Sequence, residues 1–140
     1  MASPPLGPVL RILIADDHRL FAESLMAVLS QDDRVDVVGI AGNGEEAVKL
    51  AMDLQPDVIL MDIQMPVFDG LEATRRLREA GSTARILILT GADGEVGSED
   101  AVRAGASGYL RKESSVSDLK ELLLGVASLA AVLGHVHFRR

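Results

Sequence analysis

Carboxylates follow two short apolar runs of this sequence, at the points where each run ends. Asp16 and Asp17 come directly after residues 10–15, and Asp62 comes directly after four large apolar residues. This second run is bounded by prolines and is too short for a helix, so it suits a strand buried on both faces. Pro66 cannot donate to a sheet ladder, which means that the strand must end near Asp62. Open α/β sheets carry their chemistry at the carboxyl ends of strands, and we therefore expect a site centred on Asp62.

Three carboxylates at neighbouring strand ends predict a need for positive charge. Adjacent strands lie about 4.8 Å apart, and like charges at that spacing repel by roughly a few kcal/mol at an effective dielectric near 20. A small divalent cation relieves this repulsion, and Mg²⁺ prefers oxygen ligands. Asp17 could instead cap a helix that begins after it, because aspartate is a favoured N-cap residue, and both roles can hold together.

The composition is that of one α/β domain. The chain has 140 residues, of which 48% are hydrophobic, 25% charged and 3% aromatic, and these values suit a single aliphatic core. The net charge of -7 disfavours binding of this chain to nucleic acid or to an anionic membrane surface. The lack of cysteine excludes disulfides and thiolate metal sites and agrees with a cytoplasmic location. The longest uncharged stretch, residues 122–134, is too short to span a bilayer.

Short aliphatic runs alternate with helical patterns along the chain. Strands are predicted at residues 10–15, 35–40, 57–61, 85–89 and 107–110. Helices are predicted after Asp17 and then at 44–54, 71–79, 98–104 and 115–128. Three glycines within 91–97 confine the fourth helix to 98–104, because each glycine in a helix costs about 1 kcal/mol relative to alanine. The buried stripe of the first helix is expected to contain Leu20, Phe21, Ser24, Leu25, Val28 and Leu29.

This alternation predicts an α/β fold with a doubly wound, five-stranded parallel sheet of order 2-1-3-4-5 and helices on both faces. In this order the first and third strands are neighbours at the point where the winding reverses. The carboxyl ends of the strands then meet at one edge of the sheet. We expect that edge to carry Asp16, Asp17, Asp62, Thr90 and Lys112.

Four motifs resemble the receiver domain of two-component response regulators. They are Ile14-Ala15-Asp16-Asp17-His18, Met61-Asp62-Ile63-Gln64-Met65-Pro66 followed by Asp69-Gly70, Leu89-Thr90, and residues 105–112. Each motif alone is weak, but together they are highly specific, and the resemblance covers residues 9–128. The residue types at Asp17-His18 and at 105–112 most resemble those of the NarL/FixJ subgroup. The resemblance implies a flavodoxin-like (CheY-like) fold. It also implies that the chain is a signalling domain and not an enzyme.

The resemblance also implies a role for individual side chains. Asp62 would be the phosphoacceptor and would receive a phosphoryl group from a sensor histidine kinase, a transfer that mostly needs positioning and charge neutralisation. Lys112 would pair with one phosphoryl oxygen, and Thr90 would donate its hydroxyl to another. Thr90 and Tyr109 would act as the switch. The ligands of Mg²⁺ or Mn²⁺ would be Asp16, Asp17, Asp62 and the backbone carbonyl of Gln64.

Other interpretations of these residues stay open. A lone tyrosine on a strand, as Tyr109 is, is more often half-buried packing. His135 and His137 could share one face of a strand, but two histidines without a third ligand are weak evidence for a metal, and we assign them to a tail. His18 would be exposed at the start of the first helix and has no expected catalytic role. The chain could also be a pseudo-receiver that serves as a constitutive interaction module. A phosphatase is a poorer hypothesis, because Gln64 occupies the expected position of its second acid.

The predicted organisation is a flexible lead-in at 1–8, the receiver at 9–128 and a tail at 129–140. This tail is too short for the helix-turn-helix domain that NarL/FixJ members usually carry. The chain is therefore expected to be a free-standing receiver or the receiver part of a transcriptional regulator. A homodimer is expected through the fourth helix, the fifth strand and the fifth helix, or through a carboxyl-terminal apolar surface that contains Leu122, Leu124, Leu129, Val132 and Leu133.

Overall fold

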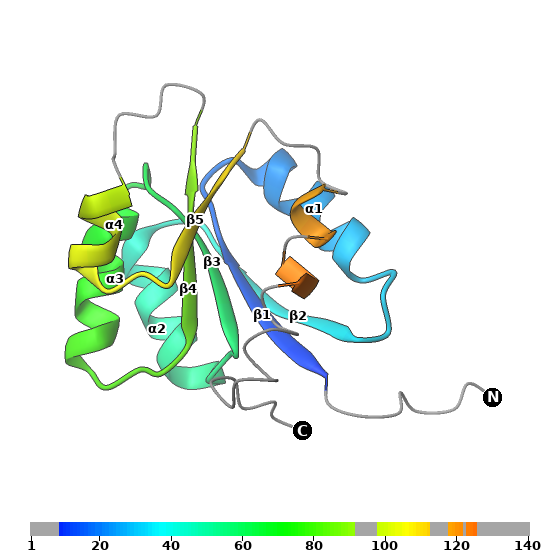
Figure 1. Cartoon of the computed structure of the whole chain (residues 1–140), viewed down its shortest axis with the longest axis horizontal. Helices are drawn as coiled ribbons and strands as arrows, with labels where there is room; N and C mark the ends of the chain where they lie inside the picture. Colours follow the sequence, from blue (N-terminus) through cyan, green and yellow to red (C-terminus); the bar gives the residue numbers. More distant parts are fainter. Residues whose placement is uncertain (1–8, 92–97, 113–117, 122, 126–140) are drawn as a thin grey trace.

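Strands and helices alternate along the chain in the computed structural model, which describes residues 9–91, 98–112, 118–121 and 123–125. The strands form one parallel sheet of order β2-β1-β3-β4-β5, which confirms the predicted doubly wound topology (Figure 1). The elements are β1 (Leu10–Ala15), α1 (Arg19–Leu29), β2 (Val35–Ala41), α2 (Gly44–Leu54), β3 (Val58–Asp62), α3 (Gly70–Glu79), β4 (Arg85–Thr90), α4 (Ser98–Ala104) and β5 (Gly108–Arg111).

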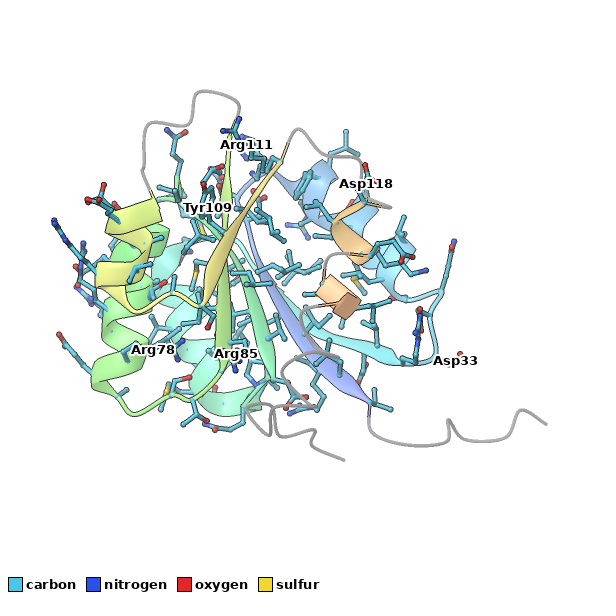
Figure 2. All side chains as sticks on the ribbon, viewed as in Figure 1. Asp33, Arg78, Arg85, Tyr109, Arg111 and Asp118 are labelled. Atoms are coloured by element: carbon cyan, nitrogen blue, oxygen red, sulfur yellow. The ribbon has the colours of Figure 1, made fainter. Side chains whose placement is uncertain are left out.

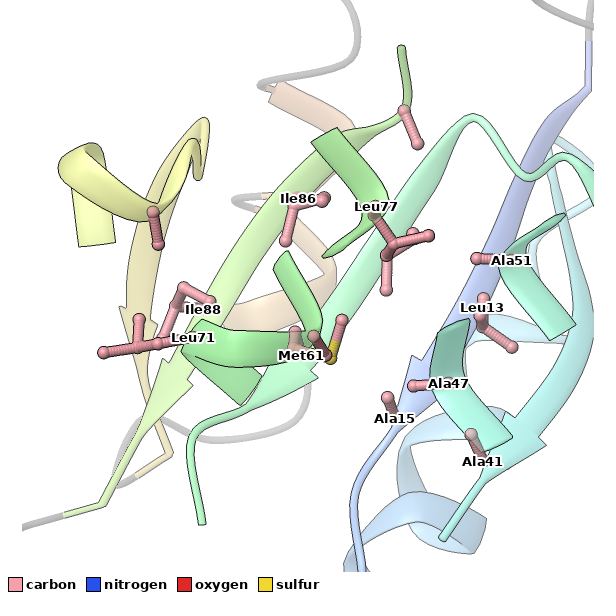
Figure 3. Close-up of a cluster of buried hydrophobic side chains, with 14 of the residues drawn as sticks. Leu13, Ala15, Ala41, Ala47, Ala51, Met61, Leu71, Leu77, Ile86 and Ile88 are labelled. Carbon is pink, nitrogen blue, oxygen red and sulfur yellow. The ribbon is translucent and has the colours of Figure 1, made fainter. Parts of the chain in front are cut away.

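The central strand β3 is buried on both faces, as its apolar sequence predicts. Ile59 and Met61 belong to a core beneath α2, α3 and α4, which Figure 3 shows in close-up. Val58 and Leu60 belong to a second core on the opposite face, beneath α1. A fully buried aliphatic side chain contributes about 1.5–3 kcal/mol. The two cores therefore hold β3 firmly, and with it the carboxylate of Asp62 at its end.

Polar side chains define where two of the helices begin. The Asn43 side chain accepts a hydrogen bond of 2.8 Å from the Glu46 amide at the start of α2, and the Asp69 side chain accepts one of 2.8 Å from Glu72 at the start of α3. Such caps satisfy amides that have no partner within the helix and contribute about 1 kcal/mol each.

The helix predicted after Asp17 is present as α1, but the structure does not support the alternative that Asp17 caps it. The N-cap residue is His18, without a side-chain cap bond, so Asp17 does not cap this helix. Leu20 and Ser24 are wrongly predicted as buried, since Leu20 is 80% exposed and Ser24 is exposed as well. The buried stripe of α1 consists of Ala22, Leu25 and Leu29, and at 100° per residue Leu20 lies about 200° away from Ala22.

The predicted fifth helix is described only at residues 118–121 and 123–125, which are helical. Leu119 and Leu123 are buried in the core beneath α1. Lys120 Nζ lies 3.7 Å from Asp32 Oδ2, in the connection between α1 and β2. The lead-in at 1–8, the glycines at 94 and 97, both tail histidines and most of the predicted carboxyl-terminal apolar surface lie outside the described residues. Within the described ranges, every helix is too short or too polar to cross a membrane.

Candidate functional site

The carboxyl ends of four neighbouring strands meet at the upper edge of the sheet in Figure 1. Asp16 directly follows β1, Asp62 ends β3, Thr90 ends β4 and Lys112 directly follows β5. Backbone hydrogen bonds continue past the strand ends, from the Asp16 amide to Ala41 O (2.9 Å) and from the Lys112 amide to Thr90 O (2.8 Å). These bonds fix the backbone on which the polar side chains stand.

The carboxylates of Asp16 and Asp62 are buried side by side. The two residues are 1% and 4% exposed. Lys112 Nζ lies 2.7 Å from Asp16 Oδ2 and 3.2 Å from Asp62 Oδ2, and it also lies 4.9 Å from the centre of the Phe21 ring. Both Oδ2 atoms are within ion-pair distance of Lys112 but lack a well-directed hydrogen bond. The pair therefore carries more negative charge than one ammonium group neutralises.

Burial and the neighbouring charges change the pKa of Asp62. Burial of its carboxyl group, followed by the negative charge of Asp16, raises the pKa of Asp62 to about 6, while Lys112 opposes this shift. A carboxylate with such a pKa is ionised above about pH 6 and protonated below it. Ionisation of Asp62 in the folded protein therefore costs free energy that a second cation could recover.

His18 lies at the mouth of the same site. Its Nδ1 atom is 3.1 Å from Asp16 Oδ1, 3.3 Å from Asp17 Oδ1, 3.7 Å from Asp62 Oδ2 and 3.2 Å from Lys112 Nζ. The His18 amide donates a hydrogen bond of 2.8 Å to Asp16 Oδ1. The sequence predicted an exposed side chain here, and 64% of it is exposed. What sequence analysis missed is that the ring turns back toward the carboxylates.

The residues present fit a divalent cation. One ligand atom from each of Asp16, Asp17, His18 and Asp62 can be chosen so that all four lie within 4.8 Å of one another. Carboxylate oxygens are the ligands that Mg²⁺ and Mn²⁺ prefer. The buried Oδ2 atoms of Asp16 and Asp62 are acceptors that such an ion would satisfy. Gln64, whose carbonyl was predicted as a further ligand, lies two residues after Asp62 in the connection to α3 and is exposed.

The two predicted switch residues lie on adjacent strands but differ in exposure. Thr90 is 5% exposed at the end of β4. Tyr109 pairs in register with Ile88 on β5 and is 45% exposed, so it is half-exposed and not packed in the core (Figure 2). Val102 on α4 is also an exposed apolar residue, at 68%. The helix α4 and the strand β5 therefore each carry a large exposed side chain, and β5 pairs with the strand that carries Thr90.

The carboxyl-terminal end of α4 is anchored to α3 by one guanidinium group. Arg78 Nε donates a hydrogen bond of 2.8 Å to Gly105 O, and Arg78 also donates one of 3.0 Å to Ser82 O. Gly105 has φ +101° and an added Cβ atom would lie 2.6 Å from Arg78 Cγ, so glycine is required at this turn. The hydrogen bond to Gly105 O therefore fixes the backbone of the connection from α4 to β5.

The raised pKa of Asp62 predicts how the stability of the metal-free protein depends on pH. In Asp62→Asn, we expect the free energy of unfolding to rise by about 1 kcal/mol above pH 6, because one of two buried like charges is removed. The gain should shrink as the pH falls from about 6 toward the ordinary aspartate value of 3.8, where Asp62 is already protonated in the folded protein. Urea unfolding at several pH values measures both effects. A gain that stays constant with pH would contradict this account of Asp62.

Most of the chain is similar to known proteins. A family model described as response regulator receiver domain matches residues 12–124. The transcriptional regulatory protein DegU of Brevibacillus brevis is 40% identical over 124 residues, which are 89% of this chain and 52% of that protein. The nitrate/nitrite response regulator protein NarL of Escherichia coli K12 is 37% identical over 122 residues, 87% of this chain and 56% of that protein. The chain thus spans about half the length of these curated relatives.

Solved structures have the same fold. The signal receiver domain of the putative response regulator NarL from Mycobacterium tuberculosis superposes with a TM-score of 0.80 at 32% identity, covering 87% of this chain and 98% of that chain. The response regulator domain of Thermotoga maritima CheB gives a TM-score of 0.77 at 29% identity, covering 87% of this chain and 96% of that one.

Proposed function

Since the chain belongs to the response regulator receiver domain family, a family of signalling domains and not of conventional enzymes, we propose that it is switched by phosphorylation of Asp62. The observation that carries the proposal is the buried Asp62 carboxylate at a strand end, with Lys112 Nζ 3.2 Å from its Oδ2 atom. An ionised carboxylate with an ammonium group beside it is the arrangement that an aspartyl phosphoacceptor needs.

In the proposed reaction a sensor histidine kinase supplies the phosphoryl group. A carboxylate oxygen of Asp62 attacks phosphorus as the bond from phosphorus to the histidine nitrogen breaks, and the electron pair of that bond stays on the imidazole. Lys112 neutralises the negative charge on the phosphoryl oxygens. Mg²⁺ or Mn²⁺, held by Asp16, Asp17, Asp62 and the Gln64 carbonyl, would supply further charge neutralisation.

The proposed output is a change in the surface formed by α4 and β5. Thr90 donates its hydroxyl to the phosphoryl group and moves toward it, and Tyr109 turns inward behind it. The exposure of Tyr109, at 45%, agrees with this proposal because much of the side-chain surface is still available for burial. Association of two chains through this surface is the proposed consequence.

The relatives suggest the regulatory setting of this chain. DegU is a transcriptional regulatory protein and NarL a response regulator, so we propose that residues 9–128 act as a cytoplasmic receiver that controls transcription through a separate DNA-binding domain. The net charge of -7 supports an output by protein contact in place of direct contact with DNA. The alternative of a constitutive pseudo-receiver gains no support from a site that retains Asp62, Lys112 and Thr90 together.

Treatment with a small acyl phosphate and Mg²⁺ tests the proposal. We expect mass spectrometry to find one phosphoryl group bound as a labile acyl phosphate. Lys112→Ala should lower the rate of incorporation by about 100-fold, which is typical of removing one group that stabilises transition-state charge. Lys120→Ala is the matched control, because Lys120 pairs with Asp32 and not with the site. A wild-type chain that takes up no phosphoryl group would support the pseudo-receiver instead.

A further inference from the structure

We propose that His18 is a ligand of the metal ion at this site, and that it strengthens the binding of Zn²⁺ and similar transition-metal ions much more than the binding of Mg²⁺. This inference rests on the proposed cation site at Asp62 and adds to it a nitrogen ligand from the start of α1. Three observations carry it: the spacing of the candidate ligand atoms, the position of Lys112, and the exposure of the ring.

The spacing agrees with ligands that share one ion. Two atoms bound to the same ion at about 2.0–2.1 Å lie roughly 2.8–3.4 Å apart, as simple octahedral or tetrahedral geometry requires. His18 Nδ1 lies 3.1 Å from Asp16 Oδ1 and 3.3 Å from Asp17 Oδ1, and Asp62 Oδ2 is only slightly farther, at 3.7 Å. Small side-chain rotations bring all four atoms onto one ion.

The ammonium group of Lys112 lies where the carboxylates of Asp16 and Asp62 attract positive charge. Its Nζ atom lies 2.7 Å from Asp16 Oδ2, 3.2 Å from Asp62 Oδ2 and 3.2 Å from His18 Nδ1. An ammonium group only donates hydrogen bonds, so this contact presents the lone pair of Nδ1 to the positive charge. The contact between Nδ1 and Asp16 Oδ1 would need the opposite tautomer. One metal ion between these atoms satisfies the nitrogen and the carboxylates at once.

The position of His18 also suits a ligand that can engage and release. Its backbone amide donates a hydrogen bond of 2.8 Å to Asp16 Oδ1, which favours a position of the residue beside the site. Its side chain is 64% exposed, so the ring can rotate and an ion can enter from solvent.

The types of ligand atom predict how His18 affects the binding of Zn²⁺ and of Mg²⁺. Three carboxylates and a carbonyl form an all-oxygen set that suits Mg²⁺ and Mn²⁺. Imidazole nitrogen suits Zn²⁺, Ni²⁺ and Cu²⁺, whereas Mg²⁺ gains little from it. Removing His18 should therefore weaken Zn²⁺ binding selectively and leave Mg²⁺ binding nearly unchanged.

Calorimetric titration of the full chain with Zn²⁺ and with Mg²⁺ at one neutral pH tests the inference. The background is His135→Gln with His137→Gln, which removes the other two histidines of the chain and any zinc site that they form. On this background, adding His18→Gln should lower Zn²⁺ affinity by about tenfold or more and change Mg²⁺ affinity by less than about twofold. His18→Phe, with thermal melts on every variant, guards against a defect in folding.

Nitrogen NMR of the imidazole gives a second readout that does not depend on affinity. With His18 as the one remaining histidine, its Nδ1 resonance should shift strongly with Zn²⁺ and only slightly with Mg²⁺. Zn²⁺ affinity that survives both His18 variants, or an Nδ1 resonance unmoved by Zn²⁺, would overturn the role of His18 while Mg²⁺ binding still supports the proposed site. If neither ion perturbs the amides around Asp62, both the inference and the cation site fall.

Discussion

Asp62→Asn is expected to abolish phosphoryl incorporation from an acyl phosphate while leaving the fold intact. Asparagine matches aspartate in shape, but its neutral amide is no nucleophile toward phosphorus, so the loss should be complete. The side chain is buried, and removing its charge does not leave a buried cation unpaired. Lys112 Nζ still lies 2.7 Å from Asp16 Oδ2. The defect should therefore lie in chemistry and not in stability.

Asp57→Asn is the matched control for this experiment. Asp57 precedes the opposite end of the same strand and is 6% exposed, which is similar to Asp62. Its Oδ2 atom accepts a hydrogen bond of 2.9 Å from the Arg11 amide, and the oxygen of asparagine can keep this bond. We expect Asp57→Asn to take up a phosphoryl group at the wild-type rate.

Intact mass spectrometry, followed by peptide mapping of the labile group, measures the result. Continued incorporation in Asp62→Asn at the wild-type rate would show that another side chain is the acceptor. Loss of incorporation in both variants would indicate a general defect of the sheet, and the proposed mechanism would then lack its main support.

The sheet was predictable because its signals are local and numerous. Each aliphatic run between turn residues specifies a strand by itself, and the alternation with helical patterns leaves few topologies. The position of Asp62 then follows, because Pro66 ends the strand and a parallel sheet brings all carboxyl ends to one edge. Lys112 and Asp16 reach the same edge for the same reason, although their sequence separation is 96 residues, from 16 to 112.

What the sequence could not show depends on side-chain rotation and on where a helix starts. α1 begins at Arg19, two residues after Asp17, and this start turns Leu20 to solvent. It also makes His18 the N-cap residue, and its χ angles then decide whether the ring faces the solvent or the carboxylates. A residue directly after two predicted ligands could have been flagged by its position alone, but the contact itself needs coordinates.

Close approach of one backbone segment to another is the feature least visible in a sequence. Gly70, the first residue of α3, lies against the backbone of Asp62, and its amide donates a hydrogen bond of 2.8 Å to Ile63 O. A Cβ atom at residue 70 would overlap the carbonyl oxygen of Asp62 and lie 2.9 Å from its carbonyl carbon. The sequence predicts a helix at 71–79, directly after Asp69-Gly70, but it does not predict this contact.

Gly70→Ala should therefore destabilise the fold strongly. The clash is with backbone, which cannot rotate away, so either α3 or the end of β3 must shift. We expect the free energy of unfolding to fall by about 3 kcal/mol or more, the upper range for overpacking. The shift would also displace Asp62, so phosphoryl incorporation should slow in the fraction that folds.

Gly42→Ala is the control, because an added Cβ atom there has nothing within 4 Å. This variant should change the free energy of unfolding by no more than about 0.5–1 kcal/mol, since alanine mainly restricts the unfolded chain. Urea unfolding of both variants, with amide NMR spectra of the residues around Asp62, gives the comparison. If Gly70→Ala unfolds at the same urea concentration as Gly42→Ala and leaves the Asp62 and Ile63 amides unmoved, then α3 does not press on the end of β3. The position of Asp62 would in that case depend on the two cores alone.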